Sequence, residues 1–149
     1  MSTFVSKSIL DELKPYVAIE ALKVERDIMQ YFRAIQRRFP IGLNRIDWSR
    51  IAKAKYRKVK EDEQIEGAIR NFLKDLFPQL HGEEWNERVI WLADRTDFAL
   101  AMPLKLLFRE SELLFRHDQH YYVFPEGMNW MLNLTFERDL YFTSSGETP

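Results

Sequence analysis

The chain has 149 residues, of which 46% are hydrophobic, 14% aromatic and 30% charged. This composition is typical of one compact domain with a buried core, and it excludes a disordered or low-complexity chain. The absence of cysteine excludes disulfides, thiolate metal sites and a cysteine nucleophile. No stretch has the ~18 to 20 uninterrupted apolar residues of a membrane span, and the first ten residues lack the features of a signal peptide. We therefore expect a soluble, cytoplasmic protein.

The formal net charge is −1, but it is unevenly distributed. Between Glu20 and Lys60, twelve Lys and Arg stand against four Asp and Glu, whereas residues 61–149 carry eight against seventeen. If these two parts pack together, the molecule has a basic side and an acidic side. Either side could steer an oppositely charged partner.

The first part of the chain has the spacing of helices. Directly after Pro15, apolar residues recur every three or four positions through residues 16–39, which predicts one long helix there, preceded by a short helix at residues 7–14. Pro40 and Gly42 then break the periodicity. Between them, these helices are expected to present one apolar face to the core.

A basic helix is expected next. Asp47 stands at an N-cap position ahead of residues 48–60, and the helical spacing returns within residues 61–76, before Pro78 and Gly82. Whether residues 48–76 form one helix or two stays open at this point.

From residue 88 onward the pattern changes to strands. Residues 89–92 form a short apolar run that ends in an acidic turn, and residues 98–102 could return beside it. Pro103 can then begin a helix with Leu104, Leu107 and Phe115 on its inner side.

Two further strands, residues 120–124 and 128–136, meet across a turn that contains Pro125 and Gly127. The second strand alternates apolar and polar residues, which predicts one buried face. Residues 140–143 can form a last strand, and residues 144–149 a frayed tail. The predicted fold is a single α+β domain over residues 1–149, helical in 1–80 and strand-rich in 88–143, with the N-terminal helices packed on one face of a C-terminal antiparallel sheet.

Motifs of catalysis and metal binding are weak in this sequence. His117 and His120 are clustered, but on an extended loop their ligand atoms do not converge as they would at helical spacing, so a solvated polar loop is the preferred interpretation. Asp94 and Asp97 are explained by turn formation. The chain also lacks a glycine-rich phosphate loop and a nucleophile elbow. We therefore expect neither an enzyme nor a cofactor or metal.

The basic segment, residues 45–60, favours nucleic-acid binding as an alternative function. Its cations would neutralise phosphates, and Trp48 and Tyr56 could stack on exposed bases. The segment runs directly into the acidic residues 61–66, so pairing within the chain is the competing interpretation. The cations concerned are Arg45, Arg50, Lys53, Lys55, Arg57, Lys58 and Lys60.

The order of features in residues 89–142 carries a family resemblance. An apolar strand with an acidic turn is followed by the helix-like residues 103–115, then Tyr121-Tyr122-Val123-Phe124, a tight turn, Trp130, and Thr135-Phe136-Glu137-Arg138-Asp139. This order resembles the C-terminal half of bacterial immunity proteins that neutralise polymorphic or contact-dependent-inhibition toxins, including SMI1/KNR4-like and neighbouring small α+β families. Trp130 fits the tryptophan of their penultimate strand, whereas Phe136-Glu137-Arg138 departs from their histidine-containing step.

The resemblance implies a non-catalytic protein that binds a cognate protein toxin and blocks its active cleft. Toxins that act on nucleic acids need basic clefts, so carboxylates at strand ends and turns would accelerate their capture. Tryptophan and tyrosine dominate the energetics of interfaces, and two of these would anchor the partner if they are exposed. The residues expected to bind the partner are Asp94, Asp97, Glu126, Glu137, Asp139, Trp85 and Tyr141.

Overall fold

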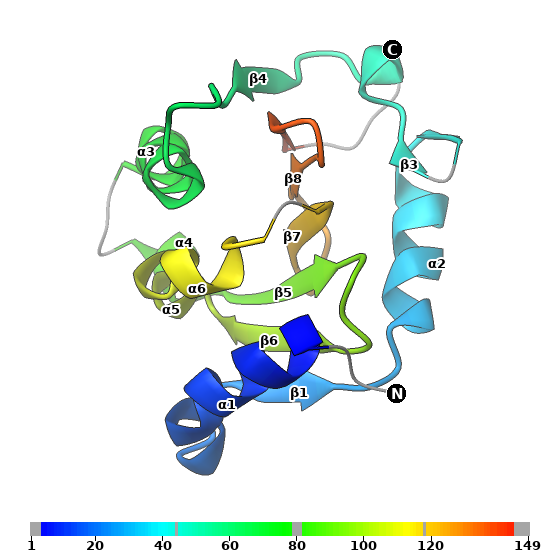
Figure 1. Ribbon diagram of the computed structural model, residues 1–149. Coiled ribbons are helices and arrows are strands. Elements are labelled where there is room, and N and C mark those ends of the chain that lie inside the picture. Colours follow the sequence, from blue (N-terminus) through cyan, green and yellow to red (C-terminus); the bar gives the residue numbers. More distant parts are fainter. Residues whose placement is uncertain (1–3, 44, 79–81, 118, 145–149) are drawn as a thin grey trace.

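The computed structural model describes residues 4–43, 45–78, 82–117 and 119–144. Seven antiparallel strands form one sheet in the order β1-β6-β5-β7-β8-β9-β4 (Figure 1). They are β1 (Lys23–Glu25), β4 (Lys55–Lys58), β5 (Arg88–Ala93), β6 (Ala99–Pro103), β7 (Tyr121–Pro125), β8 (Met131–Leu134) and β9 (Asp139–Thr143). A small separate hairpin consists of β2 (Ile41–Gly42) and β3 (Arg45–Ile46). The predicted α+β class and antiparallel sheet are confirmed.

The sheet is covered on both faces. The helices are α1 (Phe4–Ala18), α2 (Met29–Arg38), α3 (Ile65–Leu76), α4 (Glu83–Asn86), α5 (Leu104–Arg109) and α6 (Ser111–Leu114). Leu13 of α1 and Ile69 of α3 share one core with the sheet residue Trp91. Ile35 of α2 packs on the opposite face, against a second core around Ile90. Figure 1 shows α2 on one side of the sheet and α3 to α6 on the other. The expectation of N-terminal helices on one face thus holds for α1 and α3, and α2 covers the other face.

The predicted long helix over residues 16–39 is wrong. Pro15 lies inside α1, and the helix ends at Ala18. Glu20 then adopts a left-handed φ of 60°, which an α-helix does not accommodate. The chain next forms β1, and α2 begins at Met29. The apolar periodicity of residues 16–39 does not match the burial. Leu22 lies off the apolar face of the predicted helix but is buried, whereas Val17 lies on that face and is 39% exposed.

The predicted basic helix over residues 48–60 is also wrong, although Asp47 does act as an N-cap. Its carboxylate accepts a hydrogen bond from the backbone N–H of Ser49 at 3.2 Å, at the start of a single 3-10 turn, η1 (Trp48–Arg50). The chain then becomes extended and Lys53 has a φ of 62°. The basic side chains that follow belong to the edge strand β4, which pairs with β9. The helix of residues 61–76 is confirmed as the separate α3.

The C-terminal half follows the prediction closely. Strands β5, β6, β7 and β9 lie within one residue of their predicted positions. Strand β8 covers only 131–134 of the predicted 128–136, and the helix predicted after Pro103 is divided at Glu110 into α5 and α6. All four residues of β8 are buried, including the expected outward residue Asn133. The side chain of Asn133 is satisfied by Trp48 and by the carbonyl of Tyr121. In the described part of the chain, no helix is long and apolar enough to cross a membrane.

Candidate partner-binding cleft

A cleft of about 520 Å³ opens between the β2–β3 hairpin, η1 and the turn that joins β8 to β9. Its lining comes from segments far apart in the sequence, and it is assembled by the pairing of β8 with β9. Its lining includes Leu43, Arg45, Trp48, Glu137, Asp139 and Tyr141.

Aromatic rings form one wall of the cleft. The rings of Trp48 and Tyr141 are stacked, with centroids 4.9 Å apart and planes 7° from parallel. Tyr56 adds a tilted contact to Tyr141 at 5.0 Å. The Trp48 indole N–H donates to the Oδ1 of Asn133 at 2.9 Å, inside the core. Because this bond fixes the indole, the wall is rigid before any partner arrives.

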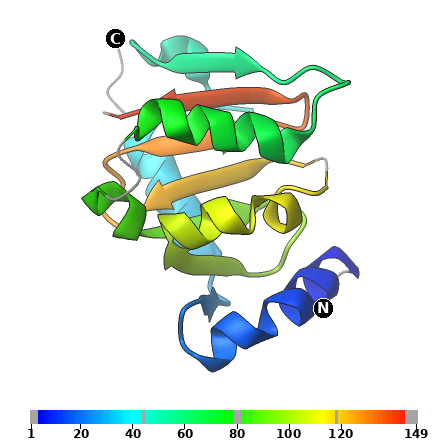
Figure 2. The same cartoon turned by 90° about the vertical axis from the view of Figure 1, so that its left-hand side faces the viewer.

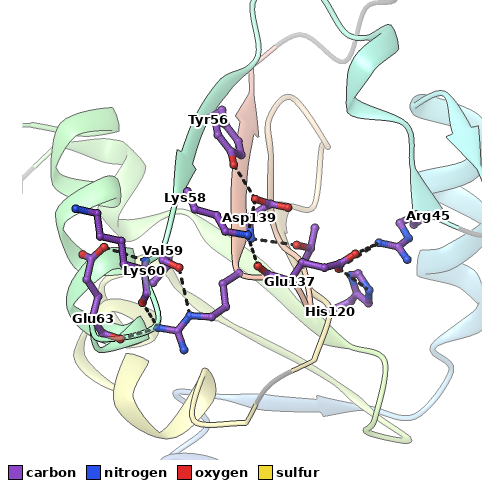
Figure 3. A network of polar contacts seen from close by, with 11 residues as sticks. Arg45, Tyr56, Lys58, Val59, Lys60, Glu63, His120, Glu137 and Asp139 are labelled. Carbon is purple, nitrogen blue, oxygen red and sulfur yellow. Dashed lines mark hydrogen bonds and ion pairs between the residues drawn. The ribbon is translucent and has the colours of Figure 1, made fainter.

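Charged groups bridge the cleft from its two sides (Figure 3). Nη1 of Arg45 on β3 donates to both carboxylate oxygens of Glu137, at 3.3 and 3.1 Å. Nζ of Lys58 donates to the Glu137 carbonyl at 2.6 Å and lies 3.3 Å from Asp139. The hydroxyl of Tyr56 donates to Asp139 at 2.7 Å. That hydrogen bond, with the nearby negative charge, raises the pKa of Tyr56 to about 12.

His120 lies behind this network. Its Nε2 is 4.0 Å from a carboxylate oxygen of Glu137, and its backbone N–H donates to Asp94. Burial lowers the pKa of His120, and the charge of Arg45 lowers it further. The hydrogen bond from Arg45 lowers the pKa of Glu137. At neutral pH this group is therefore a neutral imidazole beside an Arg–Glu ion pair.

Exposed apolar side chains occur on the segments that border the cleft. Leu43, at the tip of the β2–β3 hairpin, is 96% exposed and has a left-handed φ of 50°. Phe136 and Tyr56 are each 53% exposed. Two residues connect β2 to β3, and such a tight connection favours Asn, Asp or Gly at positions of positive φ. An exposed leucine in that conformation contributes nothing to the core and costs backbone strain.

The carboxylates predicted to bind a partner lie at both ends of the sheet. In the pairing of β5 with β7, Ala93 lies opposite Tyr121 and Val89 opposite Pro125. The turns that follow β5 and β8 are therefore at one end, and the turn that carries Glu126 is at the other. The first end holds Asp94, Asp97, Glu137 and Asp139.

Most of these carboxylates already have a cation beside them. Oxygen–nitrogen distances of 3.1 to 3.9 Å join Glu137 to Arg45, Asp139 to Lys58, Glu126 to Arg88 and Asp97 to Arg26. They are separate ion pairs distributed over the surface. The ion pairs therefore do not form a continuous acidic edge that would attract a basic toxin over a long range.

The two predicted aromatic anchors have different surroundings. Trp85 is only 2% exposed, and its indole N–H donates to the carbonyl of Phe77, so it belongs to the core. Tyr141 is half-buried in the cleft, next to the predicted Glu137 and Asp139. Sequence reasoning missed Leu43 and Phe136, because an isolated exposed apolar residue has no periodic signature.

The basic segment is partly neutralised by the chain itself. Arg57 forms an ion pair with Glu63, as the competing interpretation of the sequence expected, while Arg45 and Lys58 pair with the β8–β9 turn and the start of β9. The four remaining cations are exposed, and within the described residues they have no ion-pair partner: Arg50, Lys53, Lys55 and Lys60.

No group of three or more His, Asp and Glu side chains that could hold a metal is found among the residues that the structure describes. Asp118 lies outside those residues, and Gln119 is buried, where it accepts a hydrogen bond from the backbone N–H of Arg95.

Comparison with protein-family models and with curated proteins gives no match to this chain. The residues of the cleft are therefore the basis for a functional assignment.

Proposed function

We propose that this protein is a cytoplasmic, non-catalytic binding protein, and that it is an immunity protein that neutralises a cognate bacterial toxin. The observation that carries the proposal is Leu43, an almost fully exposed leucine in a left-handed conformation on a hairpin beside an aromatic cleft. Leu43 strains the backbone of the free protein, and its side chain packs against nothing there. The simplest explanation for such a residue is that a partner buries its side chain.

The composition of the cleft face supports a protein as that partner. Protein interfaces are enriched in Tyr, Trp and Arg, with a polar rim around an apolar centre. Here Trp48, Tyr141 and Arg45 line the same cleft as the exposed Leu43. The internal pairing of the charges makes the face nearly neutral, so affinity would come from burial of Leu43 and the aromatic rings and from polar contacts at the rim.

In this proposal the protein has no chemistry of its own and inhibits by covering the toxin. The leucine enters an apolar pocket of the toxin, and the rim carboxylates Glu137 and Asp139 meet polar or basic groups around its active cleft. The resemblance of residues 89–142 to immunity proteins is the reason for choosing a toxin among protein partners.

The test begins with the genes beside this one. The protein is co-expressed with the toxin-like product of a neighbouring gene, and growth and co-purification are measured. Restored growth with a stable complex is the expected result. A toxin-like neighbour that is neither neutralised nor co-purified would contradict the immunity function.

Variants of Leu43 then test the face. Leu43→Ala and Leu43→Asn both remove the apolar side chain and are expected to raise the Kd for the toxin about tenfold or more, which is typical of a central anchor. Met29→Gln is the matched control, because Met29 is another exposed apolar residue, on α2 outside the cleft. If the Leu43 variants and the control bind equally well, this face is not the interface.

Nucleic-acid binding is the second candidate function. It is supported by the cations of Arg50, Lys53 and Lys55, which have no ion-pair partner within the described chain, and by the exposed Tyr56. Its test is binding to single-stranded RNA and DNA over a series of salt concentrations. The variant K53E/K55E is expected to abolish such binding while leaving toxin capture through Leu43 intact. Two results together would favour this second function: salt-sensitive nucleic-acid binding that K53E/K55E removes, and toxin capture that the Leu43 variants leave unchanged.

A further inference from the structure

The outer edge of β1 is open. Only β6 pairs with this strand, and among the described residues no other segment pairs with its outer side (Figure 2). Beside β1, a pocket of about 540 Å³ is lined by Val17, Leu22 and Val24 together with the charged residues Glu20, Lys23 and Arg88, the last from β5. Ile19, in the turn just before the strand, is 73% exposed. Unpaired backbone and exposed aliphatic side chains thus occur together at this edge.

The sequence of β1 is complementary to itself in one antiparallel register. Lys23 and Glu25 lie on the same face of the strand, where their side chains form an ion pair at 3.3 Å. In an antiparallel pair of β1 strands centred on Val24, Lys23 of each copy lies opposite Glu25 of the other. Two cations and two anions then alternate on one face, and the two Val24 side chains meet on the other face. A register centred on Lys23 or Glu25 would place like charges opposite each other.

The opposite edge of the sheet does not have this property. Three of the four residues of β4 are cations, and antiparallel pairing of two β4 strands would bring Lys55 against Lys58. Lysine on an edge strand is a common protection against such pairing. One edge of the sheet is thus protected by charge, whereas the other is neutral and self-complementary.

We propose that two copies of this chain pair through β1, in the register centred on Val24, and join their sheets into one continuous sheet. The second copy occupies this open edge, and its Val24 side chain packs against Val24 of the first copy. The partner-binding cleft lies toward the β4 end of the sheet, so each copy in the dimer keeps its cleft free. This inference does not depend on the proposed function.

A single introduced thiol tests the register directly, because the chain has no cysteine. Opposed residues of an antiparallel pair have Cβ atoms about 4.5–5.5 Å apart, within reach of a disulfide after small adjustments. Under mild oxidation, Val24→Cys is expected to form a covalent dimer at least about tenfold faster than Lys55→Cys, the matched control on the other edge. Equal rates for the two variants would overturn the proposal.

Charge exchange provides a second, independent test. Sedimentation equilibrium of the full chain should show a dimer, and Lys23→Glu or Glu25→Lys alone should raise its Kd about tenfold, since each makes two opposed pairs repulsive. The double variant K23E/E25K restores the opposite charges and should restore the dimer. Circular dichroism and thermal unfolding confirm that each variant is folded. A wild-type chain that stays monomeric at high concentration, or a double variant no tighter than the single ones, would contradict the proposed dimer.

Discussion

Arg45 and Glu137 connect two parts of the structure that the backbone does not join. The guanidinium belongs to the β2–β3 hairpin and the carboxylate to the turn between β8 and β9, and their contact at 3.1 Å spans the cleft. Both side chains are about half exposed, so the pair contributes only about 0–1 kcal/mol to stability. The contact joins the hairpin that carries Leu43 to the β8–β9 turn across the cleft.

Arg45→Ala is expected to raise the pKa of two neighbours at once. Without the guanidinium, the Glu137 carboxylate loses the hydrogen bond that lowers its pKa, and His120 loses a like charge that lowers its pKa. Both values should therefore move upward, which NMR titration of the two side chains can measure. The variant R33A, on the exposed part of α2, is the control and should leave both values unchanged. A downward shift of either pKa would show that the charge of Arg45 is not the cause.

Stability should fall as the solution is acidified through the histidine range. His120 has a folded-state pKa below its ordinary value of 6.5, because the buried imidazole resists protonation. Its contribution is thus present above 6.5 and is lost as the pH decreases toward the folded-state pKa. Urea unfolding at a series of pH values measures this, and His120→Gln should give a flatter profile in that interval. An identical profile for H120Q would contradict the assignment to His120.

Trp48 and Asn133 provide a prediction about the buried wall of the cleft. Trp48→Phe keeps an aromatic ring but removes the donor to the buried Oδ1 of Asn133, so it should destabilise the protein by about 1–3 kcal/mol. Tyr141→Phe keeps the stacked ring and is expected to cost less than about 0.5 kcal/mol. Denaturant unfolding compares the two. Equal destabilisation would mean that the indole hydrogen bond does not stabilise this wall.

The accuracy of the sequence-based predictions differs between the halves of the chain for a physical reason. Strands β5 to β9 follow one another along the chain, with short connections except for the helical segment between β6 and β7, and the apolar runs and the Pro125–Gly127 turn specify them locally. β1 and β4 are edge strands that pair with partners far away in sequence, β6 and β9, so no local pattern reveals them. Helical spacing in residues 16–39 and 48–60 was coincidental, and tertiary pairing overrode it.

The candidate site shows the same difference. Glu137, Asp139 and Tyr141 were predicted from the β8–β9 region, and the structure brings them into one cleft. Trp48 was assigned to a basic helix, and its stacking on Tyr141 depends on a contact between residues distant in sequence. Trp85 was predicted as a surface anchor, but its burial depends on packing against Phe77 and Phe108. A single sequence does not determine which aromatic residue a neighbouring helix covers.

Arg138 holds the segment after β4 through its side chain. Its guanidinium donates to the carbonyl oxygens of Val59, Lys60 and Glu63, and its own φ is 69°. Arg138→Ala should destabilise the protein by about 1.5–3 kcal/mol, because charge-assisted hydrogen bonds are lost. Arg138→Gly loses the same bonds but relieves the left-handed backbone, so it should be less destabilised than R138A by about 1 kcal/mol. Thermal unfolding measures the order, and a glycine variant less stable than the alanine variant would contradict it.

Leu43 combines a prediction about stability with the proposed interface. Leu43→Asn places a residue that tolerates positive φ at the hairpin tip and removes a side chain with no packing, so it should stabilise the free protein by about 1 kcal/mol. Leu43→Ala keeps the unfavourable φ and should leave stability almost unchanged. Both variants lose the apolar anchor, so both should bind the partner more weakly. A gain in stability for L43N with unchanged binding would show that the leucine is strained without serving the interface. If L43A binds the partner more weakly at unchanged stability, the loss of binding comes from the missing apolar contact and not from a change in the backbone.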